Sequence, residues 1–424
     1  MILKCQLVLA CACFCVFVSA QIKLNKLTEV FAWKQIDYNI DGVKYLKDTN
    51  VEKRVNAIYF DDELENRDKF FIQYNNVPIG FEVYEDKVFV TVPRRQYGIP
   101  STLNYVKIPT TKNKSPALRP YPDAECNRDL VSVYRPRVDV CGRLWMVDTG
   151  LLEVPGARQQ IQKPSIVIYD LKTNKRLLKY ELKDSVIVTE RTPGGLTSIT
   201  VDVTRDNCNN AYAYINDLAT EGMVVFSLQQ LDSWRIEHES FKHDPQALNF
   251  TVAGHVITWK DGLFSIALSD PDASGNRRAF YHPLVSTQEF VVDTDVLKKR
   301  KPFRSTLLGT RGNNSQSGSS AYHAGTQTIF YANVARDAIL CWNVGTELTP
   351  GNLAMVAQDH DLLVYISDLK VIGDEVWVLV NQIPRFVLST LNVDELNFYI
   401  HRAKVQDLIH NTVCEQPGVN FVHY

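Results

Sequence analysis

Six short apolar runs recur along the chain, and their spacing limits the folds open to it. Each run is rich in β-branched and aromatic residues and too short for a helix core, so each predicts a β-strand. Successive runs start 56, 67, 52, 65 and 48 residues apart. Such a loose period is typical of a propeller, in which each repeat forms one four-stranded blade. The runs are Val88–Val92, Leu144–Asp148, Ala211–Ile215, Leu263–Leu268, Thr328–Ala332 and Val376–Val380.

Turn signals and a second apolar run follow most of these strands, which indicates hairpins. For example, Asn216–Gly222 separates the third run from Met223–Leu228. Hairpins without intervening amphipathic helices indicate an antiparallel protein. We therefore predict an all-β fold, a six-bladed β-propeller with short helical insertions. The alternative, an up-and-down β-sandwich, would show turn signals about every 8 to 12 residues but no longer period.

The first 20 residues have the three parts of a secretory signal. They are the positive Lys4, the apolar stretch Cys5–Val18 and the small residues Ser19 and Ala20 before an expected cleavage site. The alternative, a membrane anchor, would need about 20 apolar residues. No Gly/Ser-rich or Pro-rich linker divides the rest of the chain, so residues 21–424 are expected to form a single propeller domain that is secreted to the extracellular space.

Charge and motif content exclude several classes of function. The net charge of −2 gives no reason to expect a nucleic-acid partner, and no later segment is long and apolar enough to predict a membrane partner. The chain has no P-loop, GxGxxG, HExxH or G-x-S-x-G motif in a suitable context. We therefore expect no cofactor, no zinc proteolysis and no triad hydrolysis.

Cysteine and asparagine patterns fit a secreted chain. Three asparagines, Asn113, Asn249 and Asn313, begin N-x-S/T triplets and are predicted glycosylation sites. No cysteine pair beyond the signal has the C-x-x-C spacing of a zinc or redox site, so disulfides are favoured. Their odd number leaves at least one thiol unpaired or paired between chains. The cysteines beyond the signal are Cys126, Cys141, Cys208, Cys341 and Cys414.

Several longer motifs are similar to those of one insect family. Pro93–Asn104 reads PRRQYGIPSTLN, and Val133–Arg135 is followed by Val138–Gly150, which reads VDVCGRLWMVDTG. On these motifs the chain resembles the yellow / major royal jelly protein family, with matches in order from about residue 33 to residue 414. The resemblance implies a secreted six-bladed propeller. Shorter matching segments are Ala213–Asp217, Asp232–Arg235, Phe280–Leu284, Gly309–Gly312 and Cys341–Asn343.

The resemblance also implies a disulfide pattern. Cys141 is expected to pair with Cys208, and Cys341 with Cys414. The second bridge would tie the C-terminal tail to the ring. Cys126 lies outside this pattern and is the expected odd thiol.

Within the family, the chain most resembles the branch that converts dopachrome in insect melanin synthesis. The segments that carry this narrower match are Tyr74–Pro78 and the pair Gln159–Gln160 followed by Pro164–Ile166. Other members are pigmentation proteins, nutritional jelly proteins or salivary binders of biogenic amines. The fold alone therefore does not fix the activity.

Polar residues cluster where the predicted strands end or where the last repeat begins. Strand ends at one face of a propeller converge on the axis, so we expect these side chains to ring one mouth of the channel and to bind substrate or ligand. The alternative is that they cap strands and form Asx-turns. A ring of carboxylate and amide oxygens also suits calcium, but acidic residues do not fill every ligand position, so no metal site is assigned. The residues are Asp148, Thr149, Asn216, Asp217, Asn333, Asp368 and Asn381.

Conversion of dopachrome sets specific chemical requirements. Dopachrome is a quinone-type dihydroindole with a carboxylate, and it must lose a proton or carbon dioxide while electrons flow into the quinone. Asp148 and Asp217 are the candidate bases and His282 the candidate acid. A cation would bind the carboxylate through two hydrogen bonds. The candidate cations are Arg94, Arg95 and Arg143.

Three functions remain open on the sequence alone. The first is a dopachrome isomerase or tautomerase, with or without decarboxylation. The second is an extracellular protein that binds a biogenic amine or catechol without turnover, through stacking and cation–π contacts. The third is a structural or nutritional protein without a ligand. Saturable turnover, saturable binding alone, or neither would distinguish them.

Overall fold

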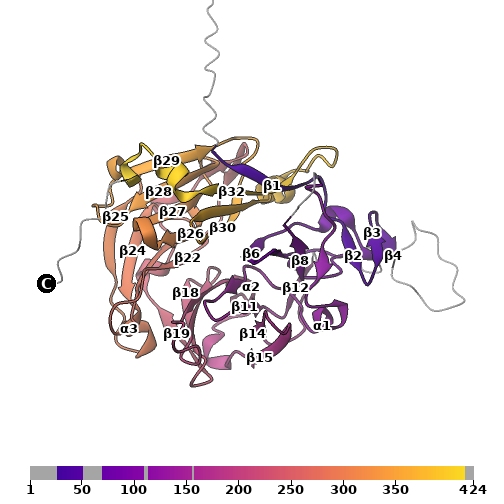
Figure 1. The fold of residues 1–424 in the computed structure, drawn as a ribbon, viewed down its shortest axis with the longest axis horizontal. Coiled ribbons are helices and arrows are strands. Elements are labelled where there is room, and N and C mark those ends of the chain that lie inside the picture. The colour runs from indigo at the N-terminus through magenta and orange to yellow at the C-terminus, as the bar shows by residue number, and fades with distance from the viewer. Residues whose placement is uncertain (1–25, 51–68, 109–112, 155–156, 416–424) are drawn as a thin grey trace, which may run out of the picture.

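The structure is a computed structural model that describes residues 26–50, 69–108, 113–154 and 157–415. Within these ranges, six four-stranded antiparallel sheets surround a common axis, and the chain passes round the ring from indigo to yellow (Figure 1). The predicted all-β, six-bladed β-propeller with short helical insertions is confirmed. The predicted signal, residues 1–20, lies outside the described residues, and the domain boundaries 1–20 and 21–424 stay predictions.

The blades follow one another along the chain, and the strands of each blade are named from the axis outward. The first three are β6 (Gly80–Tyr84), β7 (Lys87–Thr91), β8 (Leu103–Lys107) and β9 (Arg119–Pro120); β10 (Arg137–Val138), β11 (Arg143–Asp148), β14 (Ser165–Asp170) and β15 (Lys175–Glu181); and β16 (Leu196–Asp202), β17 (Tyr212–Asp217), β18 (Gly222–Ser227) and β19 (Asp232–Glu237). The last three are β22 (Leu263–Leu268), β23 (Arg278–Pro283), β24 (Gln288–Asp293) and β25 (Thr306–Thr310); β26 (Ser317–His323), β27 (Thr328–Asn333), β28 (Ala338–Asn343) and β29 (Leu353–Gln358); and β30 (Ile366–Ile372), β31 (Glu375–Val380), β32 (Phe398–Lys404) and β1 (Thr28–Trp33).

Short helices and two-stranded hairpins occupy the connections. The hairpins are β2–β3 (Tyr38–Ile40, Val43–Tyr45), β4–β5 (Thr49–Asn50, Lys69–Phe71), β12–β13 (Leu151–Val154, Ala157–Gln160) and β20–β21 (Phe250–Val252, His255–Ile257). The helices are α1 (Ala124–Arg128), α2 (Thr192–Gly195), α3 (Thr294–Lys298), α4 (Ile383–Leu388) and α5 (Val405–Ile409). The 3₁₀ turns are η3 (Gln73–Asn75), η4 (Asp184–Val186), η5 (Glu239–Phe241), η6 (Pro245–Ala247), η7 (Ala324–Thr326), η8 (Pro350–Asn352) and η9 (Val413–Glu415).

The ring is closed by the N-terminal part of the chain. Strand β1 pairs antiparallel with β32 and completes the last blade, and the two lie side by side in Figure 1. The Lys26 ammonium donates to the carbonyl of Asp407, 2.9 Å away, on α5. Residues almost four hundred positions apart are therefore joined, so the last blade depends on the N-terminal part of the chain.

The predicted apolar runs do not all occupy the same position in their blades. Five are second strands, whereas Leu263–Leu268 is β22, the innermost strand of its blade. Second strands such as β27 and β31 are buried along nearly their whole length and are therefore mostly apolar. Most innermost strands face the axis and carry polar residues, as in Ser317–His323. The hydrophobic runs in the sequence therefore identify the second strand of a blade more often than its innermost strand.

Both disulfides implied by the family resemblance are present. Cys141, in the β10–β11 turn, is bonded to Cys208, in the β16–β17 loop, with 6.0 Å between their Cα atoms. Cys341 on β28 is bonded to Cys414 on η9, which ties the tail to the fifth blade. Cys126 on α1 is unpaired, as expected.

The surface of the described residues bears on two further expectations. Asn113, Asn249 and Asn313 are all exposed to solvent, and their glycosylation stays a prediction. No helix among the described residues is long and apolar enough to cross a membrane.

Candidate functional site

A cavity of about 350 Å³ opens at one mouth of the propeller axis. It lies on the face where the innermost strands begin and most second strands end, and we call it the axial cavity. Loops from most blades and the insertions α2, α4 and β12–β13 supply its walls. Its charged and aromatic lining residues are Arg95, Arg135, Arg158, Arg191, Glu153, Asp261, Tyr134, Trp259, Phe264 and Tyr365.

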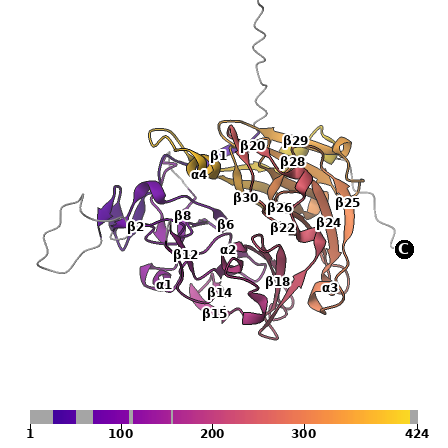
Figure 2. The same cartoon turned by 180° about the vertical axis from the view of Figure 1, so that it is seen from behind.

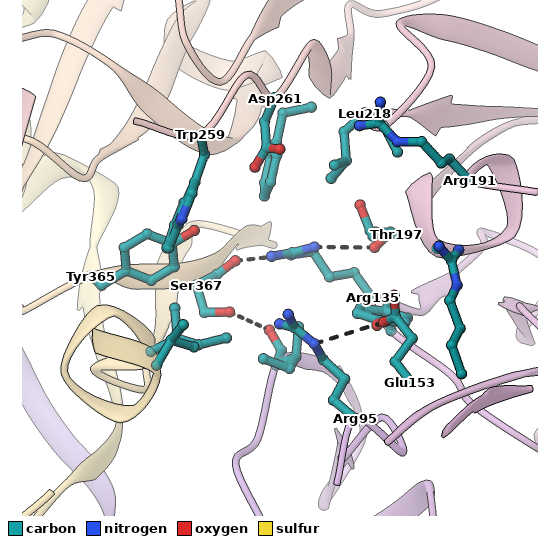
Figure 3. A pocket seen from close by; sticks show the side chains of 18 residues that line it. Arg95, Arg135, Glu153, Arg191, Thr197, Leu218, Trp259, Asp261, Tyr365 and Ser367 are labelled. Atoms are coloured by element: carbon teal, nitrogen blue, oxygen red, sulfur yellow. Dashed lines mark hydrogen bonds and ion pairs between the residues drawn. The ribbon is translucent and has the colours of Figure 1, made fainter. Parts of the chain in front are cut away.

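The floor of the axial cavity is a buried arginine that joins four blades. Arg135, just before β10, donates from Nε to the Ser367 carbonyl (2.9 Å) and from Nη1 to the Thr197 carbonyl (3.1 Å), as Figure 3 shows. Its guanidinium carbon lies 4.6 Å from the ring centroid of Phe264. Burial lowers the pKa of Arg135, and the nearby Asp368 carboxylate opposes that effect. The floor is therefore a fixed positive charge.

Asp261 is one of the two acidic residues that line the axial cavity, and its carboxylate points into the space between the arginines (Figure 3). Burial raises the pKa of Asp261 to about 6, although Arg95, Arg135 and Arg191 act in the opposite direction. A group with this pKa exchanges protons near neutral pH, as a general base or acid must.

The backbone holds Asp261 in place from both sides. Its carbonyl accepts from the Val285 amide at 3.2 Å, and the Gly262 amide donates to the Leu218 carbonyl at 3.0 Å. A Cβ on Gly262 would lie 2.6 Å from the Phe241 carbonyl oxygen, so only glycine permits this approach. The backbone at Asp261 is therefore held between two neighbouring blades.

A second acidic group shares the cavity wall with Arg95. The Tyr134 hydroxyl donates to Glu153 Oε2 at 2.8 Å, and Arg95 Nε lies 3.8 Å from the same oxygen. Burial alone would lower the pKa of Arg95, but Tyr134, Glu153 and other acidic neighbours raise it above its usual value. The Arg95 side chain therefore stays charged, and it is 44% exposed.

Arg191 is a second cation that faces the cavity, and it has no fixed partner among the described residues. Its guanidinium makes no hydrogen bond to any other described residue, and it lies on the side of the cavity opposite Trp259 and Tyr365 (Figure 3). Arg158, by contrast, donates from Nη2 to the Glu190 carbonyl at 2.9 Å. Arg95 and Arg191 are therefore the cations best placed to take an anionic ligand.

Two aromatic rings form the opposite wall. Trp259 and Tyr365 pack edge to face with 6.4 Å between their centroids. The Tyr365 hydroxyl makes no hydrogen bond to another described residue, and burial raises the pKa of Tyr365 to about 12. It is therefore a protonated donor. Four guanidinium groups against two carboxylates leave the cavity positive, which suits a flat, anionic aromatic ligand.

The predicted catalytic residues lie within the blades and outside the axial cavity. Asp148 accepts from the amides of Val131 (2.9 Å), Ser132 (2.8 Å) and Gly150 (3.0 Å). Burial raises the pKa of the Asp148 carboxyl, and these three bonds oppose it. The geometry favours a structural role for Asp148, because its carboxylate links the second blade to the preceding loop.

Asp217 and His282 are likewise enclosed. Asp217 forms a buried ion pair with Arg235 at 2.9 Å and accepts from the Thr220 amide at 3.1 Å. A Cβ on Gly195 would lie 2.0 Å from Asp217 Oδ1, so this carboxylate also fixes the end of α2. His282 lies between Glu289 (Nδ1 to Oε2, 2.9 Å) and the Gly318 carbonyl (3.1 Å).

Two of the three predicted cations, Arg94 and Arg143, also have bonding partners within the fold. Arg94 donates to the carbonyls of Ile99, Pro100, Leu130 and Val131 at 2.7–3.0 Å. Arg143 forms a buried ion pair with Asp139, with 2.7 Å between Nε and Oδ2. Of all the predicted catalytic and substrate-binding residues, Arg95 alone lines the axial cavity within the described chain.

The remaining predicted ligand-binding residues hold loops together. None of them lines the axial cavity: Asp368 lies on the innermost strand β30, and the others lie at or just after the ends of strands one layer out from the axis. Each has a backbone or side-chain partner there. The bonds are Thr149 Oγ1 to the Ser132 carbonyl, Asn216 Nδ2 to the Leu263 carbonyl, Asn333 Nδ2 to the Asn314 carbonyl, Asn381 Nδ2 to the Pro78 carbonyl, and the Phe81 amide and Ser319 hydroxyl to Asp368.

Several residues that line the cavity lie just before innermost strands, whereas the sequence pattern drew attention to the ends of strands. Trp259 and Asp261 come directly before the fourth apolar run, and Tyr365 comes directly before β30. Arg135 lies in a family motif, but no local sequence pattern marks it as a cavity residue. These four residues share one feature, which is that each lies shortly before an innermost strand.

No group of three or more His, Cys, Asp or Glu side chains in the described ranges could hold a metal ion. The acidic residues considered for calcium lie in different blades. Asp148, Asp217 and Asp368 each bond to other partners within the protein.

The structure is a six-bladed propeller with a cavity of small-molecule size at one mouth of its axis. The model of the family described as major royal jelly protein matches residues 131–414. The chain therefore belongs to the yellow / major royal jelly protein family.

Relatives in Drosophila melanogaster match almost the whole chain. The chain is 40% identical to L-dopachrome tautomerase yellow-f over 411 residues, which cover 92% of this chain and 95% of that protein. It is 31% identical to dopaminechrome tautomerase, covering 92% of this chain and 84% of that protein. It is 32% identical to protein yellow, covering 92% and 71%. The expected resemblance to the dopachrome-converting branch is confirmed.

Proposed function

We propose that this protein is an extracellular enzyme that converts dopachrome to a dihydroxyindole. The observation that carries the proposal is Asp261, whose carboxyl has a pKa of about 6 among the arginines of an aromatic-walled cavity. The name of the relative L-dopachrome tautomerase yellow-f supports the same substrate.

The cavity offers a group for each part of this substrate. Arg95 and Arg191 would bind the carboxylate, because a guanidinium can grip it with two hydrogen bonds. Trp259 and Tyr365 would flank the ring. The Tyr365 hydroxyl would donate to a quinone oxygen as that oxygen gains negative charge, which is the moment when a fixed donor lowers the barrier most.

The chemistry balances without an oxidant or a cofactor. In total, two protons leave the saturated carbons of the five-membered ring and two protons arrive at the quinone oxygens, so the product is an isomer of the substrate. Asp261, as carboxylate, takes the first proton, and the C–H electron pair enters the ring system while one quinone oxygen is protonated. Loss of the second C–H proton and protonation of the other oxygen complete the dihydroxyindole. If carbon dioxide leaves instead, the bond to the carboxylate replaces one of the two C–H bonds as the source of an electron pair, and one C–H proton is still lost. Analysis of the product distinguishes these two routes.

The alternative is a protein that binds an amine or a catechol without turnover. Glu153 and Asp261 would then hold an ammonium group beside the aromatic wall. The excess of guanidinium groups in the same cavity opposes a cationic ligand. The charge balance therefore favours the carboxylate-bearing substrate, and also favours a ligand site over a purely structural protein.

A paired-substrate assay tests the role of the arginines. The rates of loss of dopachrome and of dopaminechrome, which lacks the carboxylate, are measured with the wild-type chain, Arg191→Gln and the exposed control Arg304→Gln. We expect Arg191→Gln to lower kcat/KM for dopachrome by about tenfold or more, as for a lost charge-assisted hydrogen bond. The value for dopaminechrome should change little. Equal losses on both substrates would contradict carboxylate recognition by Arg191.

Secretion and a role in melanin formation belong to the same proposal. The predicted signal at residues 1–20 and the two disulfides support an oxidising, extracellular location. Asn113, Asn249 and Asn313 would then carry glycans. Collection of the chain from the medium of secreting insect cells, with a mass decrease after glycosidase treatment, would support both points. Retention in the cells would contradict them.

A further inference from the structure

A second cavity, of about 610 Å³, lies beside the axial cavity. We call it the lateral cavity. The two share Ile79, Arg95, Glu153, Arg158, Ile383 and Val387 as a common wall. Each is within the size range of a complete small-molecule site, about 300 to 1,000 Å³. Together they offer more room than a single dihydroindole needs.

The charges of the lateral cavity lie only on the common wall. Arg95, Glu153 and Arg158 also line the axial cavity, and every residue that lines the lateral cavity alone is uncharged. An anion held by Arg95 would therefore lie at the boundary of the two spaces. The rest of the lateral cavity is suited to a neutral group.

One side of the lateral cavity is aromatic and apolar. Tyr74 packs against Phe386 of α4 with 5.4 Å between ring centroids, and the Tyr74 hydroxyl accepts from the Leu391 amide at 3.0 Å. These contacts fix α4 against the segment before the first blade. Helix α4 also contacts the β20–β21 hairpin, as Figure 2 shows. The aromatic side is therefore a fixed surface on which a ring could lie.

The other side carries polar groups without protein partners. The Gln96 carboxamide and the Thr390 hydroxyl make no hydrogen bond to any described residue. Asn75 donates from Nδ2 to the Tyr97 carbonyl at 2.9 Å, and its Oδ1 makes no hydrogen bond within the described chain. Amide and hydroxyl oxygens of this kind accept hydrogen bonds from aromatic hydroxyl groups.

We propose that the lateral cavity is a second binding site, which takes a neutral dihydroxylated aromatic ring while the axial cavity holds its anionic ligand. The ring would lie on Phe386, and its hydroxyl groups would donate to Gln96, Asn75 and Thr390. Tyr74 and Asn75 belong to the segment that carries the narrower, dopachrome-branch resemblance. That the natural ring is a dihydroxyindole rests on the proposed function, whereas the binding site itself does not.

Calorimetry with stable probes tests this site. Indole-2-carboxylate is the axial probe, and 5-hydroxyindole and 4-methylcatechol are the lateral probes, so the tighter of the two identifies the ring type. We expect each lateral probe to bind equally well with and without saturating indole-2-carboxylate. Phe386→Ala should weaken the lateral probes by about tenfold, as expected for loss of one aromatic contact. The matched control is Leu388→Ala, an exposed position of α4 outside the cavity lining.

A second variant guards against a folding defect in Phe386→Ala. Gln96→Ala removes a partly exposed side chain with no described partner, and it should weaken the lateral probes while indole-2-carboxylate binds as before. Competition between the two probe types, or no binding of either lateral probe, would overturn the proposal. Unchanged lateral binding in both variants would also overturn it. Dopachrome turnover is measured on the same samples, so that the two proposals are tested separately. Binding at two sites without turnover would refute the proposed function but not the lateral binding site.

Discussion

The pKa of Asp261 predicts the acid side of the pH profile. If the Asp261 carboxylate removes the substrate proton, kcat/KM for dopachrome follows its ionised fraction in the free enzyme. With a pKa of about 6, that fraction falls about tenfold between pH 7 and pH 5. The rate of dopachrome loss, with the uncatalysed rate subtracted at each pH, should therefore fall about tenfold over this range.

Two variants make the Asp261 prediction specific. Asp261→Asn should lower kcat by about 10² or more, the usual contribution of a general base, whereas the exposed control Asp270→Asn should not. Arg191→Gln should move the acid limb to higher pH, because Arg191 is one of the charges that lower the pKa of Asp261. A flat profile from pH 5 to 7, or an Asp261→Asn variant that keeps most of its activity, would refute Asp261 as the base.

Three predictions concern stability. Asp139→Ala should cost about 3 to 5 kcal/mol in urea unfolding, because it leaves Arg143 as a buried, unpaired charge; a cost below about 1 kcal/mol would contradict this. Burial lowers the pKa of His401 from 6.5 to about 4, so unfolding takes up a proton and stability falls by about 3 kcal/mol as the pH drops from 6.5 to 4. His401→Phe should remove this part of the pH dependence, and an unchanged slope would refute it. Replacing both Cys341 and Cys414 by alanine should cost about 4 kcal/mol by the chain-entropy estimate for a bridge of 73 residues, and an unchanged urea midpoint would argue against it.

The sequence was sufficient to predict the architecture because burial leaves a strong pattern. Strands such as Thr328–Asn333 are enclosed on both faces, so their apolar character repeats once in each blade. The disulfide pairs followed from the family resemblance rather than from spacing. The innermost strands were mostly missed by this pattern, because strands that face the axis carry polar residues and leave no apolar signal.

The candidate site was harder to predict because its residues come from separate parts of the chain. Arg135 reaches the axis by bonding to carbonyl groups of two other blades, and no local motif records that. Asp261 is set apart only by its surroundings, since burial and three arginines together determine its pKa. Asp148 and Asp217 were predicted to be catalytic because they end apolar strands. In the structure the Asp148 carboxylate accepts hydrogen bonds from backbone amides, and the Asp217 carboxylate is paired with Arg235.

The most direct test of the proposed activity is the decay of dopachrome with and without the purified chain, followed at neutral pH with identification of the product. The account predicts an acceleration that saturates with dopachrome, yields a dihydroxyindole and is lost in Asp261→Asn. Decay at the same rate with and without the wild-type protein would contradict it.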